Sequence, residues 1–195
     1  MTPSSLVAVL EEARDLGFLG PGPVTFHVEH ARAYLPALAG VAGAALDLGT
    51  GGGVPGLVLA AERPDLAWTF VDAMQKRTAF LARAVAALGL EVAVRTDRAE
   101  ALADLRASQD AVVARSFGAP AVTAECAAPL LRVGGRLVVS EPPDGEDRWE
   151  GAALLGLGTP ERRPGPPALV VLTQVAPCPA RYPRKTGQPS KRPLW

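Results

Sequence analysis

Cysteine and long apolar runs are scarce in this chain of 195 residues, and each scarcity excludes a class of protein. Cys126 and Cys178 form neither a disulfide framework nor the ligand spacing of a metal site. No stretch approaches the roughly eighteen apolar residues of a transmembrane helix. Glu11 and Glu12 stand where a secretory signal would need its apolar run. The sequence therefore predicts a cytoplasmic protein with no membrane partner and no metal site.

Acidic residues are missing from the C-terminal part of the chain, although the whole chain has a net charge of zero. Residues 1–161 carry a net charge of −7, and residues 162–195 carry +7 with no acid at all. Such a separation is typical of a basic arm that meets a polyanion. A solvated, proline-rich tail that only keeps the protein in solution is the alternative, and charge alone does not decide between them.

Apolar segments alternate along the chain between the strand and helix types, which predicts an α/β fold. The expected strands cover 44–48, 67–71, 91–95, 110–114, 136–140 and 168–175. The expected helices cover 4–18, 27–38, 55–62, 76–88, 100–106, 119–131 and 149–155. Strands separated by helices indicate βαβ units and a mostly parallel sheet with helices on both faces. Ligands of such sheets lie at the carboxyl ends of the strands, where the strand order reverses.

One structural domain accounts for the whole length, and it divides into three regions. Residues 1–40 form a helical extension that packs on the core, and residues 41–176 form the core itself. Residues 177–195 are a proline-rich basic tail, for which we expect no regular structure.

A glycine-rich loop follows the first expected strand and carries the strongest chemical signal. Glycine reaches backbone angles that other residues avoid and lets a ligand lie against the backbone. Gly51, Gly53 and Gly56 formally match the dinucleotide fingerprint. However, Asp47 precedes the first glycine, and a carboxylate there suits the ammonium group of a methionine better than a phosphate. The loop thus favours S-adenosylmethionine over NAD.

Asp72 ends the second expected strand, 25 positions after Asp47. A carboxylate in this place can accept hydrogen bonds from both hydroxyls of a ribose. Such a contact serves NAD and S-adenosylmethionine equally, so Asp72 indicates a nucleoside without identifying it. The alternative is that Asp72 caps the helix that follows.

Several motifs in the same order resemble the bacterial ribosomal RNA small subunit methyltransferase G family, also called glucose-inhibited division protein B. The first is the run from Asp47 to Gly56. The others are Asp72 with Lys76-Arg77 and Phe80-Leu81, Leu88-Gly89-Leu90, Arg98-Ala99-Glu100, the segment from Asp110 to Phe117, Pro129-Leu130-Leu131 before Gly134-Gly135, and the ending from Arg181 to Leu194. Together they cover about residues 44–140 and 181–194, and the combination is far more specific than the glycine loop alone.

The resemblance implies a Rossmann-like class I methyltransferase with a seven-stranded sheet and S-adenosyl-L-methionine as cofactor. It implies methylation of a guanine N7 in small-subunit ribosomal RNA. The family's cofactor positions carry over to Gly49, Val54, Ala99, Glu100 and Arg115. Asp47, Gly51 and Asp72 join them on the chemical grounds given above. Arg115 also ends the fourth strand, where the methyl acceptor is expected.

Guanine N7 has a free lone pair and no proton to lose, so its methylation needs positioning rather than a general base. The lack of a clear acid/base pair in the sequence is consistent with this chemistry. If the acceptor were a hydroxyl or a protonated amine, His27 and His30 would be the first candidates for a base. Their other interpretation is a capping or surface role on a helix.

The basic tail is the expected contact with ribosomal RNA. Phosphate contacts are expected from its cations, and Tyr182 could stack on a base or simply pack. The candidate RNA-binding residues are Arg181, Tyr182, Arg184, Lys185, Lys191 and Arg192.

Two alternatives stay open. Acids from Glu141 to Asp144 follow the fifth strand, and the N-terminal region is short, which favours a small-molecule methyltransferase on the same scaffold. The other alternative is a non-catalytic RNA-binding or assembly factor that keeps the cofactor fold. The sequence does not indicate the oligomeric state.

Overall fold

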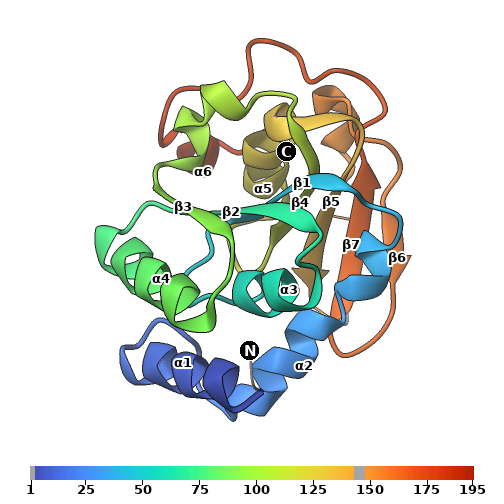
Figure 1. Cartoon of the computed structure of the whole chain (residues 1–195). Coiled ribbons are helices and arrows are strands. Elements are labelled where there is room, and N and C mark those ends of the chain that lie inside the picture. The colour runs from blue at the N-terminus through green and yellow to red at the C-terminus, as the bar shows by residue number, and fades with distance from the viewer. Residues whose placement is uncertain (1–2, 143–147) are drawn as a thin grey trace.

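A single twisted sheet of seven strands runs through the computed structural model, which describes residues 3–142 and 148–195 (Figure 1). The strand order is β3-β2-β1-β4-β5-β7-β6. The strands are β1 (Gly43–Leu48), β2 (Leu66–Asp72), β3 (Val92–Thr96), β4 (Gln109–Ala114), β5 (Leu131–Glu141), β6 (Glu161–Arg163) and β7 (Ala168–Thr173). The α-helices are α1 (Pro3–Asp15), α2 (Val24–Arg32), α3 (Gly56–Glu62), α4 (Gln75–Leu88), α5 (Pro120–Ala127) and α6 (Gln188–Lys191).

The strands from β3 to β5 all pair in parallel, and β7 and β6 close the sheet with antiparallel pairings. The expectation of a mostly parallel seven-stranded α/β sheet is therefore confirmed. Because β1 lies between β2 and β4, the strand order reverses at β1. The carboxyl ends of β1 and β4 thus form the edge at which such sheets bind ligands.

Each face of the sheet has its own apolar cluster. On one face α1, α2, α3 and α4 cover the sheet, and on the other α5 and α6 lie together with the C-terminal segment (Figure 1). The two helical layers bury both sides of β1 and β4, which explains why these strands are almost continuously apolar.

Several short elements depart from the predicted ones. The expected helix at 27–38 ends at Arg32 and continues as a 3-10 turn, Leu35–Leu38. The expected helix at 149–155 is reduced to a 3-10 turn, Ala152–Leu155. The region 100–106 forms two 3-10 turns, Ala99–Ala101 and Ala103–Leu105, instead of a helix. Helix α5 stops at Ala127 and β5 begins at Leu131, five residues earlier than expected.

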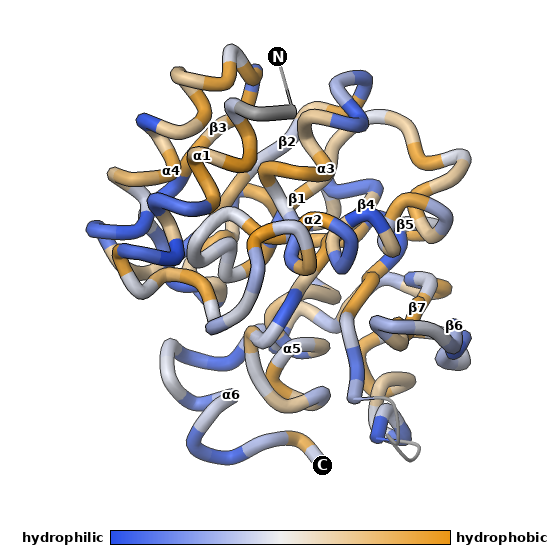
Figure 2. Tube along the Cα trace, turned by 90° about the horizontal axis from the view of Figure 1, so that it is seen from below, coloured by the Kyte–Doolittle hydropathy of each residue, from blue (hydrophilic) through white to orange (hydrophobic). Residues whose placement is uncertain are grey.

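Residues 177–195 contain regular structure, so the expectation of none was wrong. Helix α6 begins after Gly187, which adopts φ 77°. Figure 2 shows this segment in mostly hydrophilic colours next to α5. The segment holds its place through polar contacts, described below, which periodicity of apolar residues does not reveal.

Over the described ranges, none of the helices has both the length and the apolar character needed to cross a membrane.

Candidate functional site

The glycine loop leaves β1 in a conformation that only glycine adopts without strain. Gly49, Gly51 and Gly53 have φ values of 73°, 59° and 97°. A Cβ atom on Gly49 would lie 2.6 Å from the Phe117 ring, which excludes any side chain there. The loop therefore presents bare backbone at the carboxyl end of β1.

Two carboxylates hold this loop from behind. Oδ2 of Asp47 accepts a hydrogen bond of 2.8 Å from the N–H of Gly56 at the start of α3. Oδ2 of Asp72 accepts one of 3.0 Å from Gly51, and its Oδ1 accepts one of 2.8 Å from Met74. Both side chains are buried. They fix the turn that the glycines make possible.

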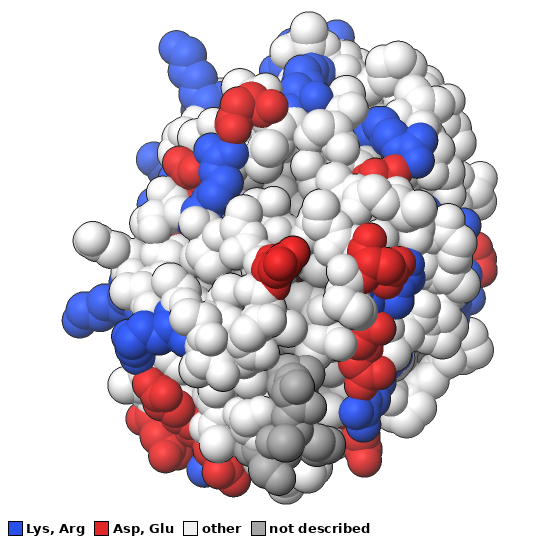
Figure 3. Space-filling view, in the orientation of Figure 1, with Lys and Arg blue, Asp and Glu red and all other residues white. Residues whose placement is uncertain are grey.

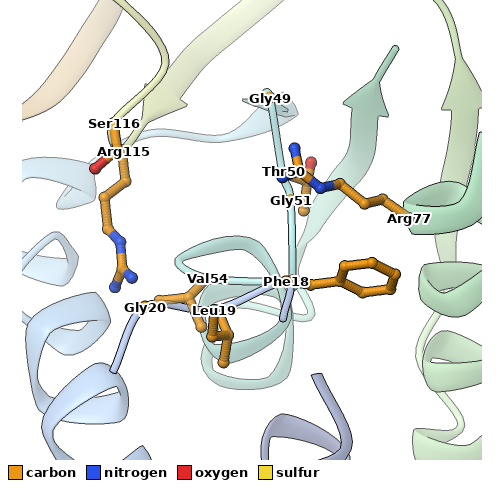
Figure 4. A pocket seen from close by; sticks show the side chains of 11 residues that line it. Phe18, Leu19, Gly20, Gly49, Thr50, Gly51, Val54, Arg77, Arg115 and Ser116 are labelled. Atoms are coloured by element: carbon orange, nitrogen blue, oxygen red, sulfur yellow. The ribbon is translucent and has the colours of Figure 1, made fainter. Parts of the chain in front are cut away.

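In front of the loop lies a cavity of about 320 Å³, which we call the first cavity (Figure 4). It lies at the carboxyl ends of β1 and β4, where the strand order reverses. Its lining comes from the turn after α1, the glycine loop, α4 and the end of β4: Phe18, Leu19, Gly20, Gly49, Thr50, Gly51, Gly52, Val54, Arg77, Arg115 and Ser116.

Arg115 enters the first cavity from the end of β4, and His27 holds it in place. Nη2 of Arg115 lies 3.3 Å from Nδ1 of His27, and Nε2 of His27 lies 3.2 Å from the carbonyl oxygen of Gly20. Arginine can only donate, so Nδ1 must accept, and the imidazole proton on Nε2 points to Gly20. His27 is thus a bridge that positions Arg115 against the turn after α1.

Buried polar atoms without partners gather around the first cavity. Among the described residues, these include Oδ1 of Asp47, Nη1 of Arg115 and Nε of Arg77. Burial raises the pKa of Asp47 to about 7, opposed by the Gly56 N–H and by Arg115. Buried groups without partners are costly, so Nη1 of Arg115 and Nε of Arg77 in the lining of this cavity favour a polar ligand. An anionic group suits Nη1 of Arg115.

A second cavity of about 340 Å³ adjoins the first at Ser116, at the carboxyl ends of β4 and β5. Its lining residues are His30, Ser116, Phe117, Gly118, Pro120, Val139, Ser140, Glu141, Pro142, Arg148 and Trp149. Burial lowers the pKa of His30 to about 4, helped by Arg115 and His27, so its imidazole is neutral at pH 7. Asp144, which the sequence placed at this exit, lies outside the described residues.

Ser116 joins the two cavities in an unusual backbone conformation. Its φ is 52°, in the left-handed region that residues with a side chain rarely adopt. Arg115 faces the first cavity and Phe117 lines the second. A turn at Ser116 therefore directs the side chains before and after it to different cavities.

Ala99 and Glu100 lie away from the lining of the first cavity. Ala99 is buried, while Oε1 of Glu100 accepts a hydrogen bond of 2.8 Å from the N–H of Gly187. This segment follows β3, and the N–H of Asp97 donates to the carbonyl oxygen of Asp72, so the segment begins beside the end of β2. Glu100 thus connects the side of the sheet near Asp72 to the C-terminal segment.

The C-terminal segment is anchored by Arg184. Its backbone N–H, Nε and Nη2 donate to the carboxylate of Glu125 on α5 at 2.9, 2.8 and 2.5 Å. The Glu125 side chain is fully buried. Tyr182 is buried as well, with 7% of its surface exposed, and Arg106 donates to its carbonyl oxygen. Both residues therefore have structural contacts within the protein.

The other cations of the predicted RNA contact are exposed: Arg181, Lys185, Lys191 and Arg192. The guanidinium of Arg181 lies over the ring of Tyr182, 5.0 Å from its centroid. On the face shown in Figure 3, acidic and basic side chains are interspersed and do not form one large basic field.

The first cavity brings together half of the predicted cofactor residues, namely Gly49, Gly51, Val54 and Arg115. It places Asp47 and Asp72 directly behind the loop. Sequence reasoning missed the wall formed by Phe18, Leu19 and Gly20. The glycines and prolines after α1 indicated only the end of a helix, and no local pattern showed that this turn meets Arg115.

The fold and the glycine loop at the reversal of strand order define an S-adenosyl-L-methionine-dependent methyltransferase of class I. A solved structure of a Methanococcus maripaludis protein assigned to such methyltransferases has a TM-score of 0.62, at 12% identity, over 78% of this chain and 87% of that one. The Thermus thermophilus 16S rRNA N2 G1207 methyltransferase has a TM-score of 0.50, at 28% identity, over 70% of this chain and 36% of that one. The first likeness shows the fold alone.

Sequence comparison is more specific. The family model for rRNA small subunit methyltransferase G (GidB) matches residues 27–151, so the chain belongs to this family. The ribosomal RNA small subunit methyltransferase G of Moorella thermoacetica is 37% identical over 76% of this chain and 68% of its own length. That of Deinococcus radiodurans is 41% identical over 77% of this chain and 65% of its own length. The aligned region thus spans about two thirds of these relatives, and the resemblance inferred from the motifs is confirmed.

Proposed function

We propose that this protein transfers the methyl group of S-adenosyl-L-methionine to N7 of a guanine in small-subunit ribosomal RNA. The observation that carries the proposal is the pair of cavities that meet at Ser116. One is built around the glycine loop, and the other offers space for a base at the ends of β4 and β5. Membership of the rRNA small subunit methyltransferase G family supports the choice of acceptor.

The residues of the first cavity fit the cofactor. When bound there, S-adenosyl-L-methionine would supply an activated methyl group on its sulfonium. Gly49, Gly51 and Val54 leave room for a ligand against the backbone, and Nη1 of Arg115 offers a buried donor for the methionine carboxylate. Asp72 keeps unused lone pairs for ribose hydroxyls, because each carboxylate oxygen accepts about two hydrogen bonds.

The remaining predicted cofactor residues act from further away. Asp47 supports the loop through Gly56, and its free Oδ1 is the candidate partner for a cationic group. We assign Ala99 and Glu100 to the nucleoside side of the site, because their segment begins beside the end of β2, where Asp72 lies. The proposed chemistry needs no proton acceptor, since N7 carries a free lone pair. His30, neutral at pH 7, then lines the acceptor side without acting as a base.

The proposed RNA contact narrows to the exposed cations of the C-terminal segment. Arg181, Lys185, Lys191 and Arg192 are the candidates for phosphate contacts. Tyr182 and Arg184 hold the segment in place, so their proposed role in RNA binding is to position these cations.

We propose a cytoplasmic location, where ribosomal RNA is available. We also propose one structural domain with an N-terminal extension at 1–40, a core at 41–176 and the basic segment at 177–195.

The test is to map N7-methylguanosine in 16S rRNA from a strain that lacks this gene and from the same strain complemented with it. One site is expected to lose its methyl group and to regain it on complementation. A variant in which Lys185, Lys191 and Arg192 are all glutamine should restore methylation poorly. An unchanged methylation pattern would refute the acceptor and leave a small-molecule substrate, whereas binding of NAD in preference to S-adenosylmethionine by calorimetry would refute the cofactor.

A further inference from the structure

The second cavity contains a buried carboxylate that has no part in the proposed binding of the cofactor. Glu141 is the last residue of β5, and its side chain is only 4% exposed. Oε2 of Glu141 has no hydrogen-bond partner among the described residues. A buried carboxylate oxygen with no donor is unfavourable, so a ligand that supplies one would be favoured.

Arg148 pairs with this carboxylate without using its hydrogen-bonding capacity. Nη1 of Arg148 lies 3.7 Å from Oε2 of Glu141, close enough for attraction but too far for a hydrogen bond. Both residues line the second cavity. The pair is neutral overall, so the acid at the end of β5 does not repel a nucleic acid as an isolated carboxylate would.

The rest of the lining suits a flat heterocycle. Phe117 and Pro142 present apolar surface, and Ser116 opens towards the first cavity. Aromatic side chains stack on any base, so they supply affinity but do not distinguish one base from another. The polar groups of the cavity must then provide the selection.

Among the four standard RNA bases, only guanine places two donors side by side on its pairing edge, namely N1–H and one N2–H. A carboxylate offers two acceptors side by side, and acidic side chains recognise base donors in this way. We propose that Glu141 is a specificity-determining residue that accepts hydrogen bonds from N1–H and N2–H of the acceptor guanine, with Arg148 as its charge partner. This inference rests on the proposed function. It leaves N7, at the far end of the base, directed towards Ser116 and the first cavity.

The inference is tested with a short RNA that contains the mapped acceptor, made with either guanosine or inosine at that one position. Inosine keeps N7, O6 and N1–H and lacks only the N2 amino group. The wild-type protein should methylate the guanosine RNA with a kcat/KM about tenfold to a hundredfold higher, as expected for loss of one hydrogen bond to a charged group.

Glu141→Gln tests the carboxylate itself. The amide replaces one acceptor by a donor that opposes N2–H, so the preference for guanosine should fall to within about twofold. Glu150→Gln, the same change on an exposed residue outside the cavity lining, should keep the wild-type preference. Affinity for S-adenosylmethionine, measured by calorimetry, should be unchanged in Glu141→Gln, which shows that the fold and the first cavity are intact.

Two results would overturn the inference while leaving the proposed function in place. One is equal methylation of both RNAs by the wild-type protein, and the other is a Glu141→Gln variant that still prefers guanosine. If neither RNA receives a methyl group at N7 from the wild-type protein, the proposed function fails as well.

Discussion

The two cavities meet at Ser116 and yet are built in different ways. Backbone from a single loop, residues 49–52, forms much of the first cavity, and carboxylates at the ends of β1 and β2 hold that loop. Side chains from α2, the turn after β4, the start of α5, β5 and the segment after β5 form the second. A site made of backbone depends on where glycine is required, whereas a site made of side chains depends on the identity of each residue. The first is therefore suited to a constant ligand and the second to selection.

The supports of the two cavities differ as well. The turn after α1 closes the first cavity, held through His27 and Arg115. The second cavity borders α5, whose first residue Pro120 lines it, and α5 is bound to the C-terminal segment through Glu125. The turn after α1 thus supports the first cavity, whereas the C-terminal segment is bound to the helix that borders the second.

The largest expected effect comes from breaking the backbone cavity. Gly49→Ala places a methyl group 2.6 Å from the Phe117 ring at a φ of 73°, so the loop must move. We expect the affinity for S-adenosylmethionine to fall at least a hundredfold by calorimetry, about 3 kcal/mol.

Gly89→Ala is the matched control, because Gly89 has a similar φ of 63° with nothing near its Cβ position. It should reduce the free energy of unfolding by about 1 kcal/mol through backbone strain and leave cofactor affinity unchanged. Equal loss of affinity in both variants would contradict a role for the space at Gly49.

The next effect concerns the support of the second cavity. Arg184→Ala leaves the fully buried Glu125 carboxylate without its charged partner, although the backbone N–H of residue 184 still donates to it. Removal of one member of a buried pair costs about 3 kcal/mol or more, so chemical denaturation should show a loss of this size. Cofactor affinity of the folded protein should change little, since the first cavity lies apart from α5.

Arg163→Ala is the control for that variant, because Arg163 pairs with Glu161 on the surface. Its cost should stay below about 1 kcal/mol. Similar losses in the two variants would show that the C-terminal anchor adds nothing beyond an ordinary surface contact.

The last comparison separates the cavities by the sign of their response to pH. Since the pKa of His30 is lowered to about 4, the unfolded chain binds a proton there below about pH 6.5 while the folded protein does not. Stability from this group is therefore lost as the pH falls from about 6.5 to about 4. His30→Asn should flatten the slope of unfolding free energy in that range.

Asp47, behind the first cavity, acts in the opposite direction. Its pKa is raised to about 7, so the folded protein holds a proton that the unfolded chain has released above about pH 4. Its contribution lowers stability as the pH rises from about 4 to about 7. Asp47→Asn should remove that loss of stability. The two substitutions should therefore change the pH slope of the unfolding free energy in opposite directions, and changes of the same sign would contradict the assignment.

The sheet and the first cavity could largely be predicted because their signals are local. Strands from Ala44 onward alternate with helices, and the glycines within ten residues of Asp47 predict the loop that they form. The contact of His27 with Arg115 joins residues 88 positions apart, and that of Arg184 with Glu125 spans 59. No periodicity encodes such pairs, since they depend on how the elements pack. For the same reason the sequence suggested RNA for Arg184 and Tyr182, which the fold uses internally.

Glu141 was noticed in the sequence only as an acid near an expected RNA surface. Its burial and its pairing with Arg148 change the meaning of that charge. An isolated exposed carboxylate would oppose RNA, whereas a buried and neutralised one can choose among bases. Burial, which the sequence does not reveal residue by residue, decides between these outcomes.

The left-handed backbone at Ser116 limits the distance between the residues that line the two cavities. Arg115 on one side of it and Phe117 on the other are separated by two peptide units, at most about 7 Å between their Cα atoms. The spacing of the two ligand sites is therefore fixed by covalent geometry as much as by packing. The backbone around Ser116 therefore holds the proposed sites of the methyl donor and the methyl acceptor a short distance apart.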